Sequence, residues 1–468
     1  MSNTQRLVVV LVLGWLGGIS LAAQTKQHRP NLIFLLTDDQ RWDTLGSYGN
    51  SLIHTPNIDA LARDGVVFDN MFVTTSICAP SRASILTGQY VRRHGIWDFQ
   101  TELTAAQLSR SYLGVLKKAG YKIGFIGKWG VGNPPASFFD FDRTFPGQGQ
   151  YFVAIEGKEH HLTSVMGDQA LEFLQSAESD IPFCLSVSFK AAHVQDSYDL
   201  GEDPFPFDPD LTYLYQEIEI PLPTASGPQL FESLPPFLQN SENRMRWAVR
   251  FWGPRRYQDS VKGYYRLVSG VDVVVGRIVE TLRAKGLLEN TVIIFTGDNG
   301  FFLGEFGLAG KWLPHEVSIR VPLVIFDPRL TSAQRNQHRS ELALNIDLAP
   351  TMLGLADLKP PDAMQGLNLS PLIKGEQIDW REEFFYEHHY RHERIPPTEA
   401  VRTGRWKYIR YVETQPLYEE LYDLREDPAE TKNLANLPDY RPQLLKMRVK
   451  WMRLREQAGS PAVTTVPG

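Results

Sequence analysis

A cysteine followed four residues later by an arginine is the first feature of this chain that could carry chemistry. The segment from Ser76 to Gly88 reads SICAPSRASILTG. We expect a helix to begin here, which would direct backbone N–H groups and the guanidinium of Arg82 at an anion. A lone cysteine is more often a small hydrophobic core side chain. The motif therefore indicates an anion site only if distant parts of the chain agree with it.

Carboxylates stand at the ends of two apolar runs. Asp38 and Asp39 follow the run NLIFLLT, and Asp298 and Asn299 follow the run TVIIFTG. Continuous apolar runs are typical of buried parallel strands, whose carboxyl ends carry the sites of open α/β sheets. One such pair alone is more often a turn or a helix cap. Two pairs together indicate a hard cation such as Ca²⁺ or Mg²⁺ rather than zinc.

Cationic and proton-transfer groups follow other apolar segments. Lys128 comes directly after IGFIG, His193 follows FCLSVSFKAA, and Lys311 lies in LGEFGLAGKW, downstream of Asp298. A lone lysine or histidine is usually solvated or paired elsewhere, but these positions just past predicted strand ends favour a site. Such a ring of donors would stabilise the charge that develops when a tetrahedral anion is attacked.

These strings, in this order, resemble the type I sulfatases of the alkaline phosphatase-like superfamily, and the resemblance extends over nearly the whole chain after the leader. Cys-x-Pro-Ser-Arg with the Leu-Thr-Gly tail is similar to the family's signature. The resemblance implies that Cys78 is oxidised to Cα-formylglycine, whose hydrated aldehyde is the nucleophile. It also implies one divalent cation, Ca²⁺ rather than Mg²⁺. Its ligands would be Asp38, Asp39, residue 78, Asp298 and Asn299.

The same resemblance implies roles for the cationic groups. Arg82 would contact the formylglycine, and Lys128 the sulfate and the nucleophile. His193 and Lys311 would contact the sulfate and the leaving oxygen. The implied substrate is a sulfated carbohydrate, and the implied partner is a formylglycine-generating or anaerobic maturation enzyme.

Two positions depart from the family pattern. Gly130 stands where the lysine block of the family commonly has a histidine. Phe306 takes the histidine position of the family's common string Leu-Gly-Glu-His-Gly. These departures keep open a non-catalytic glycan-binding relative. A phosphodiesterase or phosphonate hydrolase of the same superfamily is the other alternative, because it would share the carboxylate sites. The complete cysteine motif favours the sulfatase.

The elements that must position these residues alternate along the chain. Strand patterns at 31–37, 123–126, 183–189, 292–296 and 322–326 alternate with helical patterns at 55–62, 103–119, 165–175 and 264–285. This alternation predicts an α/β fold with a mixed, mostly parallel sheet and helices on both faces. We assign residues 28–358 to this catalytic domain. A Pro-rich, acidic and aromatic insertion at 193–255 is expected to be a loop that roofs the pocket.

The sequence pattern changes after residue 358, where the segment Lys359-Pro360-Pro361-Asp362 indicates a linker. Short strands at 384–390, 400–401, 406–411 and 421–424 and a helix near 441–455 predict a smaller C-terminal α+β subdomain with an antiparallel sheet, residues 363–468. Glu387 and His388 on its first strand are candidates for binding sugar hydroxyls or acidic groups. The alternative is an exposed edge-strand face.

The first 23 residues are typical of a signal peptide. Arg6 precedes an apolar run at 7–19, and small residues follow it. The run is short for a span of about 20 residues, so we expect export to the periplasm or outside the cell. No transmembrane span is expected in the mature chain.

Composition agrees with an exported globular enzyme. The 468 residues are 43% hydrophobic and 22% charged, with a formal net charge of −6. This charge argues against nucleic acid as a partner, while a local cationic pocket could still bind an anionic substrate. Cys78 and Cys184 are the two cysteines, so modification of Cys78 would preclude an intrachain disulfide.

Overall fold

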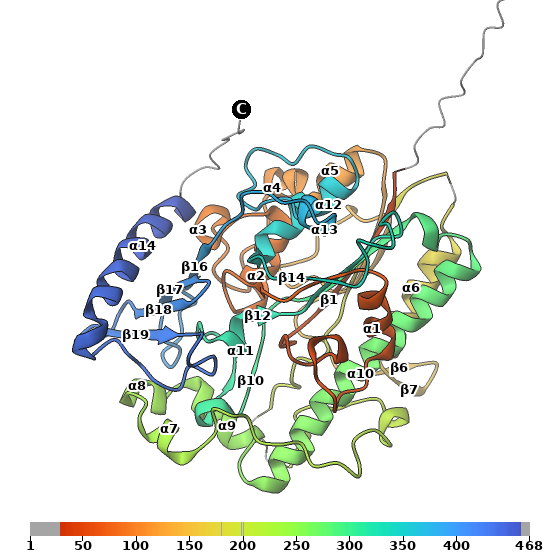
Figure 1. Cartoon of the computed structure of the whole chain (residues 1–468). Coiled ribbons are helices and arrows are strands. Elements are labelled where there is room, and N and C mark those ends of the chain that lie inside the picture. The colour runs from red at the N-terminus through yellow and green to blue at the C-terminus, as the bar shows by residue number, and fades with distance from the viewer. Residues whose placement is uncertain (1–28, 179, 198, 200, 460–468) are drawn as a thin grey trace, which may run out of the picture.

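A computed structural model describes residues 29–459 except 179, 198 and 200. The predicted signal peptide, residues 1–23, lies outside the described residues. Figure 1 shows a central sheet with helices on both of its faces and a second, smaller sheet at one side. Within the part of the chain that is described, no helix combines the length and the apolar character that a membrane crossing requires.

The large sheet has β1 (Asn31–Thr37) at its centre. β1 is parallel to both of its neighbours, β8 (Phe183–Ser188) and β9 (Thr291–Gly297). The strand order is β14-β2-β13-β9-β1-β8-β4-β5. The remaining strands are β14 (Gln337–Arg339), β2 (Val66–Phe68), β13 (Leu323–Phe326), β4 (Lys122–Lys128) and β5 (Phe141–Phe145). β13 is antiparallel to β9 and β2, so the predicted mixed, mostly parallel sheet is confirmed.

Side chains of β1 pack alternately in two hydrophobic cores, because successive residues of a strand point to opposite faces of the sheet. Phe34 and Leu36 belong to one buried cluster, and Ile33 and Leu35 belong to the other. The first cluster includes side chains of α2 (Cys78–Thr87), α5 (Tyr112–Lys118) and α12 (Leu348–Leu355). The second includes side chains of α1 (Pro56–Arg63), α6 (Leu162–Gln175) and α10 (Pro254–Ala284).

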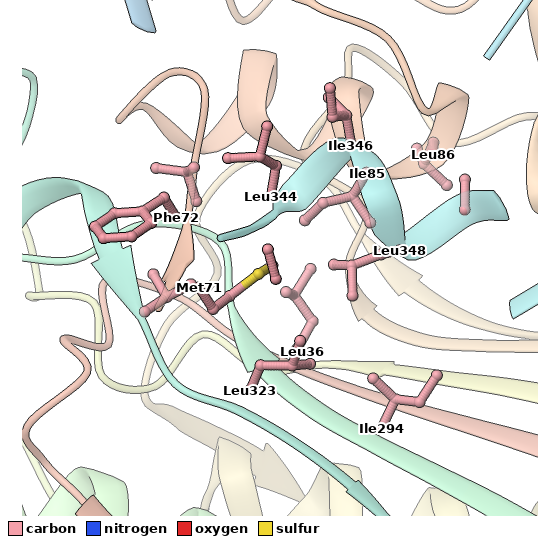
Figure 2. Close-up of a cluster of buried hydrophobic side chains, with 14 of the residues drawn as sticks. Leu36, Met71, Phe72, Ile85, Leu86, Ile294, Leu323, Leu344, Ile346 and Leu348 are labelled. Carbon is pink, nitrogen blue, oxygen red and sulfur yellow. The ribbon is translucent and has the colours of Figure 1, made fainter. Parts of the chain in front are cut away.

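Figure 2 shows how the first core joins α2 to the sheet. Ile85 of α2 lies near Leu348 of α12, above Leu36 of β1 and Ile294 of β9. Complete burial of one such side chain stabilises the fold by about 1.5–3 kcal/mol. This packing fixes the helix that begins at Cys78 over the central strands.

The largest differences from the predicted helix boundaries are in two places. The single helix predicted at 103–119 is α4 (Ala105–Arg110) followed by α5, because Ser111 adopts an extended backbone and its Oγ accepts from the backbone N–H of Gly114 at 3.2 Å. That interaction starts a new helix by capping it. α10 begins at Pro254, before the predicted start at 264, with proline in its first turn.

A four-stranded antiparallel sheet forms the C-terminal part, as predicted. Its strands, in spatial order, are β16 (Glu383–His388), β17 (Thr398–Thr403), β18 (Trp406–Tyr411) and β19 (Tyr418–Asp423). α14 (Arg441–Gly459) covers one face through Leu444 and Met447. Leu369 and Leu372 pack in the core of the large sheet, so the chain stays on that core beyond the predicted linker. The domain limits at 358 and 363 stay a prediction.

The insertion at 193–255 contains more regular structure than the predicted loop. It includes α7 (Pro228–Glu232), α8 (Pro236–Gln239) and α9 (Glu242–Arg250). Asn243 of α9 donates from Nδ2 to the carbonyl oxygens of Ala309 at 3.0 Å and Lys311 at 2.9 Å. The insertion therefore supports the backbone next to a predicted site residue.

Candidate active site

The carboxyl ends of β1, β9, β4 and β8 bring the predicted catalytic and metal residues into one place. We call these residues the strand-end cluster, and each of them is between 0 and 4% exposed. The cluster comprises Asp38, Asp39, Cys78, Arg82, Lys128, His193, Asp298, Asn299 and Lys311. Parallel pairing of Thr37 with Gly297 places Asp38 beside Asp298, as the geometry of open α/β sheets requires.

Cys78 is the first residue of α2, after an extended residue at Ile77. Two contacts hold this helix start on the sheet. The Oγ of Ser81 donates to the carbonyl oxygen of Asp298 at 2.6 Å, and the backbone N–H of Ser76 donates to the hydroxyl of Tyr386 at 3.2 Å. The second contact comes from β16, so the C-terminal sheet also positions the cysteine.

Arg82 lies one helical turn after Cys78, where residues four apart share a face. Its Nε donates to Oδ2 of Asp298 at 2.7 Å, and its Nη1 donates to the carbonyl oxygen of Lys128 at 2.7 Å and to Oγ of Ser188 at 2.5 Å. Its Nη2 lies 3.3 Å from Oδ2 of Asp38. One guanidinium therefore joins the ends of β9, β4, β8 and β1.

Each of the two lysines of the cluster pairs with one of the two aspartates that follow β1. Lys128 Nζ lies 2.5 Å from Oδ2 of Asp38, and Lys311 Nζ lies 2.5 Å from Oδ1 of Asp39. His193 Nε2 lies 3.6 Å from Oδ2 of Asp39, while its Nδ1 donates to the carbonyl oxygen of Val194 at 2.7 Å. Cations therefore surround both carboxylates.

Burial and neighbouring charges together shift the pKa values of Asp38 and Asp39 in opposite directions. Burial would raise the pKa of Asp38, but Lys128, His193 and Arg82 hold that pKa well below its ordinary value. Burial, together with repulsion by Asp38 and Asp298, raises the pKa of Asp39 to about 6, although Lys311 opposes the rise. Crowded carboxylates of this kind favour a bound cation or a proton.

The donor set fits a hard divalent cation. Oδ1 of Asp38 and Oδ1 of Asn299 are buried and have no hydrogen bond from any described residue. Carboxylate and amide oxygens are the ligands that Ca²⁺ and Mg²⁺ prefer. Ligand atoms of Asp38, Asp39 and His193 lie within 4.8 Å of one another. His193 is therefore close enough to be a ligand that the sequence prediction did not include.

The departure at Gly130 has a steric counterpart. Gly130 has φ +75°, and a Cβ added to it would lie 2.7 Å from Cδ of Arg82. A larger residue would therefore displace the guanidinium that joins the strand ends. Phe306 is buried in the core of the large sheet, and its ring lies 5.4 Å from the ring of His315.

Glu387 and His388 of β16 are buried, so the alternative of an exposed edge-strand face is wrong for both. Glu387 accepts hydrogen bonds from the backbone N–H of Arg92 at 3.0 Å and from its Nε at 2.8 Å. Neither ring nitrogen of His388 has a hydrogen-bond partner among the described residues. Their predicted contact with substrate stays a prediction.

Several residues around the cluster were not predicted from the sequence. Gln148 accepts from Lys128 Nζ at 2.6 Å, and the hydroxyl of Tyr151 donates to the carbonyl oxygen of His193 at 2.5 Å. Both precede α6, in a segment whose sequence has no regular pattern. Lys190 had a signal, because it stands just past a strand end in the same string as His193.

Two family models match the chain. The model described as sulfatase matches residues 30–358. The model described as N-sulphoglucosamine sulphohydrolase, C-terminal, matches residues 304–457. The two matches together include all four strand ends of the cluster and the C-terminal sheet.

Curated relatives carry sulfatase names. The chain is 28% identical to an N-acetylglucosamine-6-O-sulfatase of Bacteroides thetaiotaomicron, over 97% of this chain and 91% of the relative. It is 26% identical to an ulvan-active sulfatase of Formosa agariphila, over 94% and 83% respectively. It is 29% identical to the human N-acetylgalactosamine-6-sulfatase, over 78% and 70%.

Solved structures with the same fold were also found. One, a complex with its substrate D-glucosamine-2-N,6-O-disulfate, has a TM-score of 0.77 at 26% identity and covers 92% of this chain and 98% of its own. A phosphonate monoester hydrolase of Silicibacter pomeroyi has a TM-score of 0.78 at 22% identity, over 92% and 96%. The second likeness shows the alkaline phosphatase-like fold alone.

Proposed function

This chain belongs to the sulfatase family, and from that premise we propose that it removes sulfate from a sulfated carbohydrate through a formylglycine made from Cys78. The observation that carries the proposal is the position of Arg82. This side chain follows Cys78 by one helical turn and also bonds to Asp298 and to the end of β4. A nucleophile at residue 78 would therefore lie where cations and carboxylates converge.

In the first step, one hydroxyl of hydrated formylglycine gives its proton to a neighbouring carboxylate or to water and attacks sulfur, and the bond between sulfur and the sugar oxygen breaks. The leaving oxygen takes the electron pair of that bond. Lys311 and His193, both on the Asp39 side of the cluster, hold the sulfate and give the leaving oxygen a proton or a hydrogen bond. Lys128 neutralises charge on the sulfate and orients the nucleophile.

In the second step, the other hydroxyl of residue 78 loses its proton and forms the aldehyde carbon–oxygen double bond. The bond between that carbon and the sulfate oxygen breaks, and sulfate leaves with the electron pair. Addition of water to the aldehyde restores the hydrate. Gly130 offers no imidazole for the proton transfer, so another group or water must take this proton.

The proposed cation ligands are Asp38, Asp39, Asp298 and Asn299 together with residue 78. Buried oxygens on Asp38 and Asn299 that accept no hydrogen bond from the described residues support this set. We propose Ca²⁺ in preference to Mg²⁺. A cation held there would supply positive charge opposite the sulfate oxygens and help to orient the attacking hydroxyl.

Relatives support a saccharide as the substrate. Their names specify N-acetylglucosamine, ulvan or N-acetylgalactosamine, and the solved complex holds a disulfated glucosamine. Sulfate release from a panel of defined sulfated saccharides, measured by ion chromatography, tests the proposal. Turnover of at least one saccharide is expected. Hydrolysis of aryl phosphates or phosphonates with no sulfate ester hydrolysed would favour the phosphonate hydrolase alternative.

Export and maturation belong to the same proposal. One relative is described as an extracellular sulfatase homologue of Drosophila melanogaster. We propose export to the periplasm or the medium, a catalytic domain at 28–358 and a C-terminal subdomain at 363–468. The partner that converts Cys78 would be a formylglycine-generating or anaerobic maturation enzyme.

A further inference from the structure

Lys190 is a buried cation that the catalytic scheme above does not use. It follows β8, three residues before His193, and is 1% exposed. Its Nζ has no hydrogen bond and no ion pair with any described residue. The nearest aromatic group is Tyr151, whose ring centre lies 4.8 Å from that nitrogen.

The charges that act on Lys190 are those of the strand-end cluster and of Asp196. Burial, together with repulsion by Lys128, lowers the pKa of Lys190 to about 8, while Asp38, Asp196 and Asp39 act in the opposite direction. Lys190 therefore lies within electrostatic reach of the groups that are proposed to hold the sulfate. Ser188 of β8 pairs with Gly127 of β4, so the segment after β8 that carries Lys190 lies beside the strand end that carries Lys128. The family pattern commonly adds a histidine after that lysine, where this chain has Gly130.

The other cationic side chains of the site are compensated. Arg82 pairs with Asp298, Lys128 with Asp38 and Lys311 with Asp39, at 2.5–2.7 Å. A buried ammonium without an anion is unfavourable, because it has lost its hydration and gained no counter-charge. Among the described residues, Lys190 Nζ has no hydrogen bond or ion pair, and only the more distant Asp38, Asp196 and Asp39 favour its charge. An anion that enters the site would give the ammonium a direct partner.

Tyr151 explains how the ammonium is kept in place without an anion. The hydroxyl of Tyr151 donates to the carbonyl oxygen of His193 at 2.5 Å, which fixes the ring. The face of a fixed ring attracts a cation by its quadrupole. The backbone also fixes the segment, because the N–H of His193 donates to the carbonyl oxygen of Lys190 at 2.8 Å.

We propose that Lys190 is a further ligand of the scissile sulfate and donates a hydrogen bond from Nζ to a sulfate oxygen on the Lys128 side. This inference rests on the proposed function of the site. It assigns to the segment after β8 two substrate contacts, Lys190 and His193. Lys190 would also supply a contact to the sulfate on the side of the site where Gly130 replaces the common histidine.

Binding of inorganic sulfate to the matured full-length protein tests this assignment without relying on turnover. The affinity is measured by calorimetry, and the sulfate-induced rise in melting temperature is followed in parallel. Lys190→Met is expected to weaken sulfate binding at least tenfold and to reduce the melting rise. Lys190→Arg should keep most of both. Lys118→Met removes an exposed lysine at the end of α5 and should leave both unchanged.

Stability without sulfate separates a ligand from a structural lysine. A sulfate ligand is uncompensated in the free protein, so Lys190→Met should melt at the same or a higher temperature when sulfate is absent. A structural role would instead lower that temperature. If Lys190→Met does not fold, the structural role is supported and the proposal is overturned, and Lys190→Arg then checks whether the charge alone restores folding.

The outcomes also separate this inference from the proposed function. Normal sulfate affinity in Lys190→Met, with sulfate ester turnover by the wild type, would overturn the ligand assignment and leave the sulfatase proposal intact. Sulfate binding that depends on Lys190, in a matured protein that hydrolyses no sulfate ester, would support the ligand and contradict the proposed function. Absence of sulfate binding by the wild type would overturn the inference.

Discussion

The guanidinium of Arg82 donates from Nε to Oδ2 of Asp298 at 2.7 Å, and both side chains are buried. This pair connects the helix that begins at Cys78 with the end of β9. The carboxylate is therefore shared between a proposed cation site and the arginine that follows Cys78 by one helical turn. Changes at either residue should alter catalysis and stability together.

Arg82→Lys should lower kcat/KM for an aryl sulfate by about 10²–10³-fold, the usual effect of removing one positioned donor from an active site. Lysine keeps the charge but cannot span Asp298, the carbonyl of Lys128 and Ser188 with one planar fork. Steady-state kinetics measure the loss. Arg93→Lys, at an exposed position on α3 (Val91–His94), is the control and should retain full activity. Comparable values of kcat/KM for the two variants would show that the guanidinium of Arg82 does not contribute to catalysis.

Asp39→Asn should abolish turnover and the stabilisation by calcium. The substitution keeps the shape of the side chain and removes one negative charge from the proposed ligand set, which lowers cation affinity. In the wild type, Ca²⁺ at one hundred times its dissociation constant should stabilise the native state by about 2.7 kcal/mol. Melting curves with and without chelator measure this, and Asp210→Asn at an exposed position is the control. A wild type whose rate and melting temperature survive exhaustive chelation would exclude the cation.

Gly130→Ala should lower both activity and stability more than Gly95→Ala. Both glycines have φ +75°, so alanine meets the same backbone strain of about 1 kcal/mol at each. A Cβ at Gly130 would lie 2.7 Å from Cδ of Arg82, whereas a Cβ at Gly95 meets nothing within 4 Å. The clash should add about 1–3 kcal/mol of destabilisation. Equal effects of the two substitutions would show that Arg82 is not held against Gly130.

The same contact bears on a histidine at this position. Gly130→His would raise the rate of the second step only if the ring entered without moving Arg82, and the close approach to Cδ opposes that. We therefore expect a lower rate in Gly130→His, measured as steady-state turnover of an aryl sulfate. A faster steady state would show that the site adapts and that the missing imidazole limits turnover.

Glu420→Gln should stabilise the protein at alkaline pH. Burial, with repulsion by Glu430, raises the pKa of Glu420 to about 8, whereas glutamate in an unfolded chain titrates near about 4.3. Between these values the native state binds more protons than the unfolded state, so the free energy of unfolding falls as the pH rises and this group adds no further loss above about 8. Glutamine avoids that loss.

The expected gain is on the order of 1–3 kcal/mol at pH 9, with little difference near pH 4. Melting temperatures recorded across this range measure it. Glu289→Gln, at an exposed position, should show no such pH-dependent gain. A Glu420→Gln variant that is less stable than the wild type at pH 9 would mean that the carboxylate is ionised and needed there.

The central strands and the residues that follow them could be predicted because short stretches of the sequence specify them. The apolar runs before Asp38 and Asp298 are complete strands, β1 and β9, and their parallel pairing then brings the two aspartates together. The same reasoning placed Lys128 at the end of β4. The cysteine motif predicted a helix start in the segment in which α2 begins, at Cys78.

Features set by tertiary contacts could not be predicted in this way. β2 and β14 have three residues each, too few for a periodic pattern. The burial of Glu387 depends on Arg92, which lies far away in the sequence. Arg82 crowds Gly130 only because the folded chain brings the helix start against the strand ends. The same holds for Lys190, whose Nζ is buried without a hydrogen bond to any described residue.

The mass of the peptide that contains residue 78, measured in preparations of known specific activity, tests the central claim most directly. We expect the aldehyde or its hydrate in place of the thiol, and we expect the aldehyde fraction to rise in proportion to sulfate ester turnover as the maturation enzyme is supplied. Cys78→Ser, expressed in a host that does not convert it, should lose several orders of magnitude of activity, because a covalent nucleophile is removed. A fully active preparation whose residue 78 is an unmodified thiol would contradict the account.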